Sequence, residues 1–319
     1  MINSYHFLKL VLFGALLLLL TSCGSNHTSI LEHRITEYNF SKPVVSYFLP
    51  DSLDEISGIT FMNDTQIACI HDERGTLYIF DIVKDTFVNE IPLVKEGDYE
   101  DLAIADGKLY ILNSKGNLLA ITNYLDSTTA IVEKVKTSLK KDNDTEGLVY
   151  DRRLNSLLVA SKKSSGKEMK GKKGVYAYSL ATGETSLTPY ISIDIKELKD
   201  SMSDGLLWDA TIKVADFFSG SGDGSLFQPA GIAIHPFSGD YYILSSANRL
   251  LLVVSPQLKW KHLVALPTRY FYQPEGITFA PNGDLYICTE KGKRTKAAII
   301  KYTYNDSTDI MTEIKTVKQ

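Results

Sequence analysis

The sequence is poor in the residues and motifs that identify the commonest hydrolases and disulfide-bonded folds. Its 319 residues include three cysteines, six histidines and two tryptophans. No serine lies in a nucleophile elbow and no His-Glu-x-x-His zinc motif occurs. Apart from Cys23, only Cys69 and Cys288 are available for a disulfide. Buried free thiols are the favoured interpretation, because free cysteine is among the most buried residue types, and a disulfide is the alternative.

An excess of positive charge is also missing. The chain has 34 lysines and arginines against 38 aspartates and glutamates, and its formal charge is −4. Removal of a targeting segment that contains Lys9 would change this charge from −4 to −5. A basic surface dominates affinity for nucleic acid, so this composition predicts no nucleic-acid partner.

One long apolar run is present near the start of the chain. Residues 10–20 follow Lys9 and are too few to span a bilayer, but they suit the core of a signal peptide. The next four residues, Leu20-Thr21-Ser22-Cys23, resemble the bacterial lipobox, in which the cysteine becomes the lipidated first residue. We therefore expect a lipoprotein signal peptide at residues 1–22. The alternative is a plain secretory signal in which Cys23 is incidental.

The expected lipid anchor divides the remaining chain into two parts. Lipidated Cys23 and a polar tether would occupy residues 23–36, followed by one domain over residues 37–319. Several acyl chains on one cysteine hold a protein on a membrane. Gly24 and Ser25 follow the cysteine where an aspartate would favour the inner membrane, so we expect a location in the cell envelope, at the outer membrane.

A short phrase recurs five times in the domain, and in three copies a glutamate precedes the repeat position. The copies are residues 57–61, 100–104, 146–150, 230–234 and 275–279. Three further apolar runs follow each copy, often after turns such as Asp106-Gly107, which is a strong hairpin signal. Units of about 45 residues with four antiparallel strands have the size of propeller blades. The sequence therefore predicts an all-β fold, a five-bladed β-propeller.

The interval between the third and fourth copies is almost twice as long as the others. Apolar residues recur there at helical spacing over residues 192–218, and a glycine- and serine-rich loop follows. We expect one helical insertion between blades three and four; the alternative is a sixth blade. Propeller rings close by pairing distant strands, so residues 44–49 should dock beside the last blade, with residues 310–317 as the rival segment.

Strand order determines which residues share one face of the ring. Glu100, Glu146 and Glu275 open the innermost strands and should converge near the axis, on what we call the top face. The turns between the second and third strands end on that face and should form a rim. The candidate rim residues are His71, Asp72, Glu73, Arg74, Arg249, Glu290 and Lys291.

Three carboxylates in a small volume repel one another unless a cation lies among them. Hard oxygen ligands without histidine or cysteine suit calcium, so Glu100, Glu146 and Glu275 are candidate calcium ligands. The alternative is that rim lysines and arginines pair with the glutamates.

The glutamate-glycine strand openings, the serine variant at Ser57 and the segment 275–290 resemble the SdiA-regulated domain family over nearly the whole domain. The resemblance implies a five-bladed propeller, distantly similar to NHL repeats, with bound calcium, and it implies no particular activity. The family's motif glutamates correspond to Glu100, Glu146 and Glu275. The chain departs from the pattern at Asp101 and Ala230, and in a basic loop at residues 162–173 that could contact anionic lipid or polysaccharide.

Two functions follow as hypotheses. The favoured one is a membrane-anchored module whose top face binds a small-molecule, glycan or protein ligand, with calcium as the cofactor. The alternative is a calcium-dependent hydrolase of phosphoesters or lactones at the same axial site, with Arg249, Lys291 or Arg294 steadying an anionic substrate.

Overall fold

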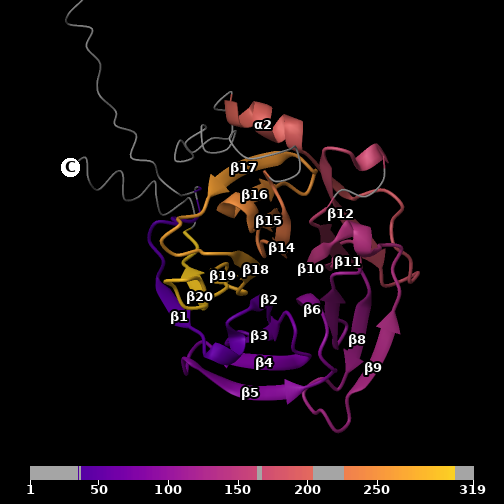
Figure 1. Cartoon of the computed structure of the whole chain (residues 1–319), viewed down its shortest axis with the longest axis vertical. Helices are drawn as coiled ribbons and strands as arrows, with labels where there is room; N and C mark the ends of the chain where they lie inside the picture. Colours follow the sequence, from indigo (N-terminus) through magenta and orange to yellow (C-terminus); the bar gives the residue numbers. More distant parts are fainter. Residues whose placement is uncertain (1–34, 36, 164–166, 204–225, 306–319) are drawn as a thin grey trace, which may run out of the picture. The chain divides into compact units, whose positions relative to one another are not determined.

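A computed structural model describes residue 35 and residues 37–163, 167–203 and 226–305 of the chain. These residues form five four-stranded antiparallel sheets arranged as the blades of a ring (Figure 1). The predicted five-bladed propeller is thus confirmed, and every named strand of the described residues belongs to one of the five blades. Among the described residues, no helix is long and apolar enough to cross a membrane.

The innermost strand of each blade carries one copy of the repeated phrase. These strands are β2 (Ile56–Phe61), β6 (Tyr99–Ala105), β10 (Thr145–Asp151), β14 (Pro229–Ile234) and β18 (Pro274–Phe279). Each packs beside the next around the ring, and β18 packs beside β2.

The outer strands follow in chain order, with one exception in the last blade. Blade one adds β3 (Gln66–His71), β4 (Thr76–Asp81) and β5 (Thr86–Pro92), and blade two adds β7 (Lys108–Asn113), β8 (Leu118–Thr122) and β9 (Ile131–Val135). Blade three adds β11 (Ser156–Ser161), β12 (Lys172–Ser179) and β13 (Ile191–Asp194), and blade four adds β15 (Tyr241–Ser245), β16 (Leu250–Val254) and β17 (Trp260–Ala265). Blade five adds β19 (Leu285–Thr289), β20 (Ala298–Tyr302) and, outermost, β1 (Val45–Phe48).

Strand β1 closes the ring. It pairs antiparallel with β20, from Val45 opposite Lys301 to Phe48 opposite Ala298. The expectation that residues 44–49 dock beside the last blade is confirmed, whereas residues 310–317 lie outside the described part. Just before β1, buried Tyr38 donates a hydrogen bond to the carbonyl of Gly283 at 2.6 Å and so fixes the start of the domain to blade five.

The repeat glycines allow the inner strands to approach one another closely. A Cβ atom on Gly231 would clash with the carbonyl oxygen of Glu275, and one on Gly147 would lie 3.0 Å from the backbone of Gly231. Asp101 replaces the glycine in blade two and is buried. Its carboxylate accepts the backbone N–H of Leu148 at 2.7 Å, so it bonds blade two to blade three.

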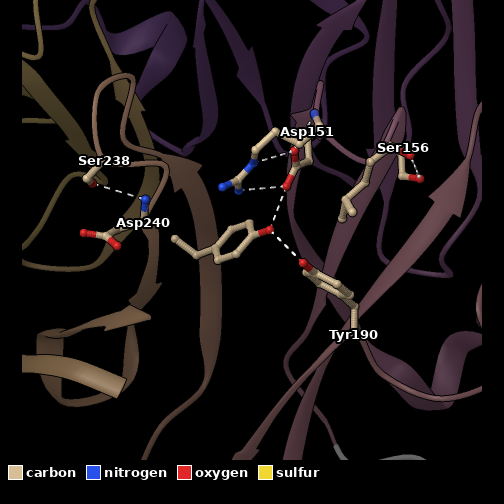
Figure 2. Close-up of polar contacts among 8 residues, drawn as sticks. Asp151, Ser156, Tyr190, Ser238 and Asp240 are labelled. Atoms are coloured by element: carbon tan, nitrogen blue, oxygen red, sulfur yellow. Dashed lines mark hydrogen bonds and ion pairs between the residues drawn. The ribbon is translucent and has the colours of Figure 1, made fainter. Parts of the chain in front are cut away.

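Blades three and four are joined by a polar contact on their facing sides (Figure 2). Buried Asp151 accepts two hydrogen bonds from the Arg153 guanidinium, at 3.2 and 3.1 Å, and one from the Tyr241 hydroxyl at 2.7 Å. The Tyr190 hydroxyl lies 3.1 Å from that of Tyr241 and completes the chain of contacts. Since each charged group here has a partner, the contact accounts for blade docking without a ligand.

The long interval between the third and fourth copies of the repeated phrase contains a helix, as predicted. Helix α2 (Ile195–Ser203) follows β13 directly, and it buries Ile195 and Leu198. This confirms helical structure after blade three, while residues 204–225 lie outside the described part. The remaining helical segments are single turns: η1 (Asp51–Leu53), η2 (Lys141–Asn143), η3 (Lys167–Met169) and η4 (Ala247–Arg249).

The two cysteines of the domain are free and fully buried, as the favoured interpretation predicted. Cys69 on β3 and Cys288 on β19 contribute to one hydrophobic cluster between blades one and five. Burial raises the pKa of both thiols. The predicted signal peptide, Cys23 and most of the tether lie outside the described residues.

Candidate functional site

The top face is built from three equivalent positions in each blade. The inner strand begins opposite the end of the second strand, as in the pairs Ile56–His71, Tyr99–Asn113 and Thr145–Ser161. The first position holds Ser57, Glu100, Glu146, Ala230 and Glu275. The second, two residues earlier, holds Glu55, Asp98, Asp144, Gln228 and Gln273, and the third, just after the second strand, holds Asp72, Ser114, Lys162, Ser246 and Glu290.

Glu100 and Glu146, which belong to neighbouring blades, share a hydrogen bond between their carboxyl groups. Burial raises the pKa of Glu100, and the charges of Glu146 and Asp98 raise it further. Burial also raises the pKa of Glu146, although Lys162 opposes this change. Because burial raises both pKa values, the two carboxyl groups share a proton as a pair.

Lys162 is the cation that reaches this pair. Its ammonium lies 2.8 Å from Oε1 of Glu146, which is only 8% exposed. Burial disfavours the charged lysine, but the carboxylates of Glu146, Glu275 and Asp144 outweigh that cost and raise its pKa. Its own carbonyl accepts a hydrogen bond from the Lys173 ammonium at 2.6 Å, which fixes the backbone of this turn.

Glu275 and Glu290 extend the acidic cluster into blade five. Burial, followed by the charges of Glu146 and Glu290, raises the pKa of Glu275 to about 8. Burial, followed by the charges of Asp72 and Glu55, raises the pKa of Glu290 to about 7. Glu275 therefore keeps its proton at neutral pH, and Glu290 is close to half-protonated.

We call Glu100, Glu146, Glu275 and Glu290 the axial carboxylates. Around them, three rim cations predicted from the sequence bind other partners. Arg74 donates to the carbonyl of Ser52 at 3.0 Å, and Arg249 donates to the carbonyl of Tyr272 at 3.4 Å. Lys291 pairs with Asp54 at 2.5 Å and Asp51 at 3.6 Å. Within the described residues, Lys162 is the one cation in an ion pair with an axial carboxylate.

The acidic rim residues gather at blade one. Nδ1 of His71 lies 2.7 Å from Oδ1 of Asp72, and the N–H of Glu73 donates to the same nitrogen at 3.1 Å. The side chain of His71 is 5% exposed, and that of Asp72 is 36% exposed.

The axial carboxylates fit calcium by donor type, since all are oxygen ligands. Their raised pKa values reflect burial first, and then negative charge that one lysine does not balance. Their present arrangement suits the Lys162 ammonium better than a metal ion. Among the described residues, one group of three side chains has candidate ligand atoms that all lie within 4.8 Å of one another, and this group is Glu55, His71 and Asp72 rather than the axial carboxylates. A calcium ion at the axis would therefore take the place of the Lys162 ammonium and of bound protons.

A cavity of about 550 Å³ lies beside blade two, lined by the segment 94–99 that connects blades one and two, by residues 113–115 of the top-face turn and by residues of β8 and β9. Asp98 borders it, and the charge of Asp98 also raises the pKa of Glu100. Its lining includes lysines 95, 115 and 134 and the apolar residues Val94, Leu119 and Val132. The volume is typical of small-molecule sites, which range from about 300 to 1,000 Å³.

Sequence reasoning missed the central place of Lys162 and the role of the second position. The sequence places Lys162 in the basic loop at residues 162–173, and its ion pair with Glu146 matches the alternative in which rim lysines pair with the glutamates. The signal was present, since it is the blade-three counterpart of Asp72 and Glu290. The residues two before the first position of each repeat include the acidic residues Glu55, Asp98 and Asp144, so this signal is also present in the sequence.

Solved structures that match this chain include two enzymes. Glutaminyl cyclase from Myxococcus xanthus superposes with a TM-score of 0.52 at 13% identity, covering 83% of this chain and 97% of that one. A PQQ-bound aldose sugar dehydrogenase from Streptomyces coelicolor gives a TM-score of 0.48 at 10% identity, covering 83% and 98%. At such identities the likeness concerns the fold alone. No curated protein matches the sequence. The family model for SdiA-regulated proteins matches residues 33–199, more than half of the chain, so this chain belongs to the SdiA-regulated family.

Proposed function

We propose that this protein is a ligand-binding propeller whose axial carboxylates bind calcium, and that the calcium site and the adjoining cavity together form the ligand site. The observation that carries the proposal is the convergence of four carboxyl groups from three blades on one lysine. Burial and mutual repulsion keep protons on this cluster at neutral pH. A divalent cation would relieve this repulsion, so the cluster favours binding one.

The calcium ligands would be Glu100, Glu146 and Glu275, with Glu290 at the edge. Bound calcium would supply an electrophilic centre that accepts oxygen atoms of a ligand. The protein would contribute a rigid ring of inner strands, and Lys162 would move toward the solvent, as its partly exposed side chain allows. The cavity lysines Lys115 and Lys134 suit an anionic small molecule, a glycan acid or an acidic segment of a protein partner.

The proposal includes the cellular setting expected from the sequence. Lipidation at Cys23 would attach the domain to a membrane, with the outer membrane of the cell envelope as the expected location. Labelling of the chain with a radioactive fatty acid, and its loss in Cys23→Ser, would test the anchor independently of calcium.

Metal analysis and thermal melts of the purified full-length protein test the calcium proposal. One calcium ion per chain and a melting temperature that falls in chelator are expected. Glu146→Gln should remove both effects, whereas exposed Glu184→Gln should remove neither. A melting temperature unchanged by calcium and by chelator would leave the Lys162–Glu146 ion pair as the resting state of the site.

A calcium-dependent hydrolase is the second candidate, and one observation favours it. The pKa values of Glu275 and Glu290, about 8 and about 7, suit groups that exchange protons near neutral pH. A panel of phosphoesters and lactones, assayed with calcium and with chelator, tests it. Turnover that disappears in Glu275→Gln while the fold is retained would support an enzyme; no turnover on the panel would favour the binding module.

A further inference from the structure

The acidic rim of blade one contains a nitrogen–oxygen contact that needs a proton or a metal ion between the two atoms. Nδ1 of His71 accepts the N–H of Glu73 at 3.1 Å, so this nitrogen presents a lone pair. Oδ1 of Asp72 lies 2.7 Å from it, is buried, and has no hydrogen-bond donor among the described residues. Two lone pairs at this distance repel each other unless a proton or a metal ion lies between them.

A third ligand lies within reach. A carboxylate oxygen of Glu55 is within 4.8 Å of the ligand atoms of both His71 and Asp72. Glu55 precedes β2 and Asp72 follows β3, and the backbone N–H of Asp72 donates to the Glu55 carbonyl at 3.1 Å, so the two strand ends are held together. The backbone therefore holds these three residues close together before any ion binds.

The surroundings leave this group negative. The charges of Asp72 and Glu55 both raise the pKa of Glu290, which places a further carboxyl group beside them. The nearby cations have other partners, since Lys291 pairs with Asp54 and Arg74 donates to a carbonyl. Within the described residues, neither Glu55 nor Asp72 forms an ion pair with a lysine or arginine.

We propose that Glu55, His71 and Asp72 form a second cation site, separate from the axial carboxylates and selective for a transition-metal dication of the zinc class. An imidazole nitrogen with two carboxylates suits zinc, whereas calcium prefers oxygen ligands alone. Ligand atoms about 2.1 Å from a tetrahedral zinc ion lie roughly 3.4 Å apart, so the His71–Asp72 contact must open by less than about 1 Å.

The site can make that adjustment at small cost. Asp72 is partly exposed and Glu55 is exposed, so both carboxylates can turn, while buried His71 stays fixed at the end of β3. Glu73 lies in an exposed turn, where water can accept its N–H once a metal ion takes the lone pair of Nδ1. A fourth ligand would come from solvent.

Zinc titration of the full-length protein, after removal of metal with chelator and in calcium-free buffer, tests the proposal. We expect one zinc ion bound per chain at this site, with affinity at least tenfold lower in Glu55→Gln and in His71→Gln and unchanged in His262→Gln. Glu55 is exposed, so its variant keeps the fold even if His71→Gln does not. Cobalt(II) in place of zinc should give the visible absorption of a low-symmetry site, and Glu55→Gln should change it.

Two results would overturn the proposal. Absence of zinc binding would mean that the N–H at Nδ1 of His71 donates a hydrogen bond to Asp72 and that the contact needs no metal ion. Zinc binding that survives in both Glu55→Gln and His71→Gln would place the ion elsewhere on the chain. Because the axial glutamates are intact in these variants, calcium binding measured in parallel separates this site from the proposed calcium site.

Discussion

Stability should fall as pH rises through neutrality, and Glu275 should account for much of the fall. Its pKa is raised from an ordinary 4.5 to about 8, because it is buried beside other carboxyl groups. Between pH 4.5 and about pH 8, the folded chain keeps a proton on Glu275 that the unfolded chain has released. The contribution of Glu275 to the free energy of unfolding is therefore fully present below pH 4.5 and lost by about pH 8. Each pH unit corresponds to about 1.4 kcal/mol, so the loss over this window approaches about 5 kcal/mol as an upper value.

Glu275→Gln removes the titrating group and keeps the shape of the side chain. In metal-free protein the variant should match the wild type at about pH 5 and exceed it by several kcal/mol at about pH 8. Urea unfolding at a series of pH values measures both free energies, and exposed Glu184→Gln serves as the control. If the profiles of wild type and Glu275→Gln are parallel across this window, the reasoning about the buried acidic cluster is refuted.

Three further changes test other parts of the account. Lys162→Met should lower the free energy of unfolding by about 2 to 3 kcal/mol at pH 8, because it leaves a buried carboxylate unpaired. Lys163→Met should lower it by less than about 1 kcal/mol, because this lysine is 66% exposed. Urea unfolding of both variants compares the two losses, provided that the free energy depends on urea concentration with the same slope. Gly231→Ala should lower the free energy of unfolding by about 2 to 3 kcal/mol, because its Cβ meets the backbone of the next inner strand, and a near-neutral result would contradict the close packing of the ring. Cys69 and Cys288 should resist thiol reagents in the native protein and react only after unfolding; fast labelling of the folded chain would show that they are not buried.

The architecture could be predicted from the sequence because each blade repeats the same local pattern. Asp106 and Gly107 both adopt positive φ values, 49° and 75°, as an Asp-Gly hairpin turn requires, so this signal is local and reliable. The repeat glycines mark where inner strands touch, and strand order then brings Glu100, Glu146 and Glu275 onto one face.

What could not be predicted depends on contacts between blades. Asp101 is a departure from the repeat when seen in the sequence, and only the structure shows its carboxylate bonded to Leu148 of the next blade. The repeat position of Lys162 places it on the top face, but only the structure shows that it pairs with Glu146 while Lys163 pairs with Asp144. Long, flexible side chains choose partners by three-dimensional distance, which sequence spacing does not encode.

The most direct test of the central claim is a calorimetric titration of calcium into metal-free protein at pH 7, repeated in buffers of different ionisation enthalpy. Calcium at the axial carboxylates must displace the protons held by Glu275 and by the Glu100–Glu146 pair. The account predicts binding of one ion with release of about one proton or more, as the raised pKa values require. Absence of binding, or binding whose heat is the same in every buffer, would contradict it.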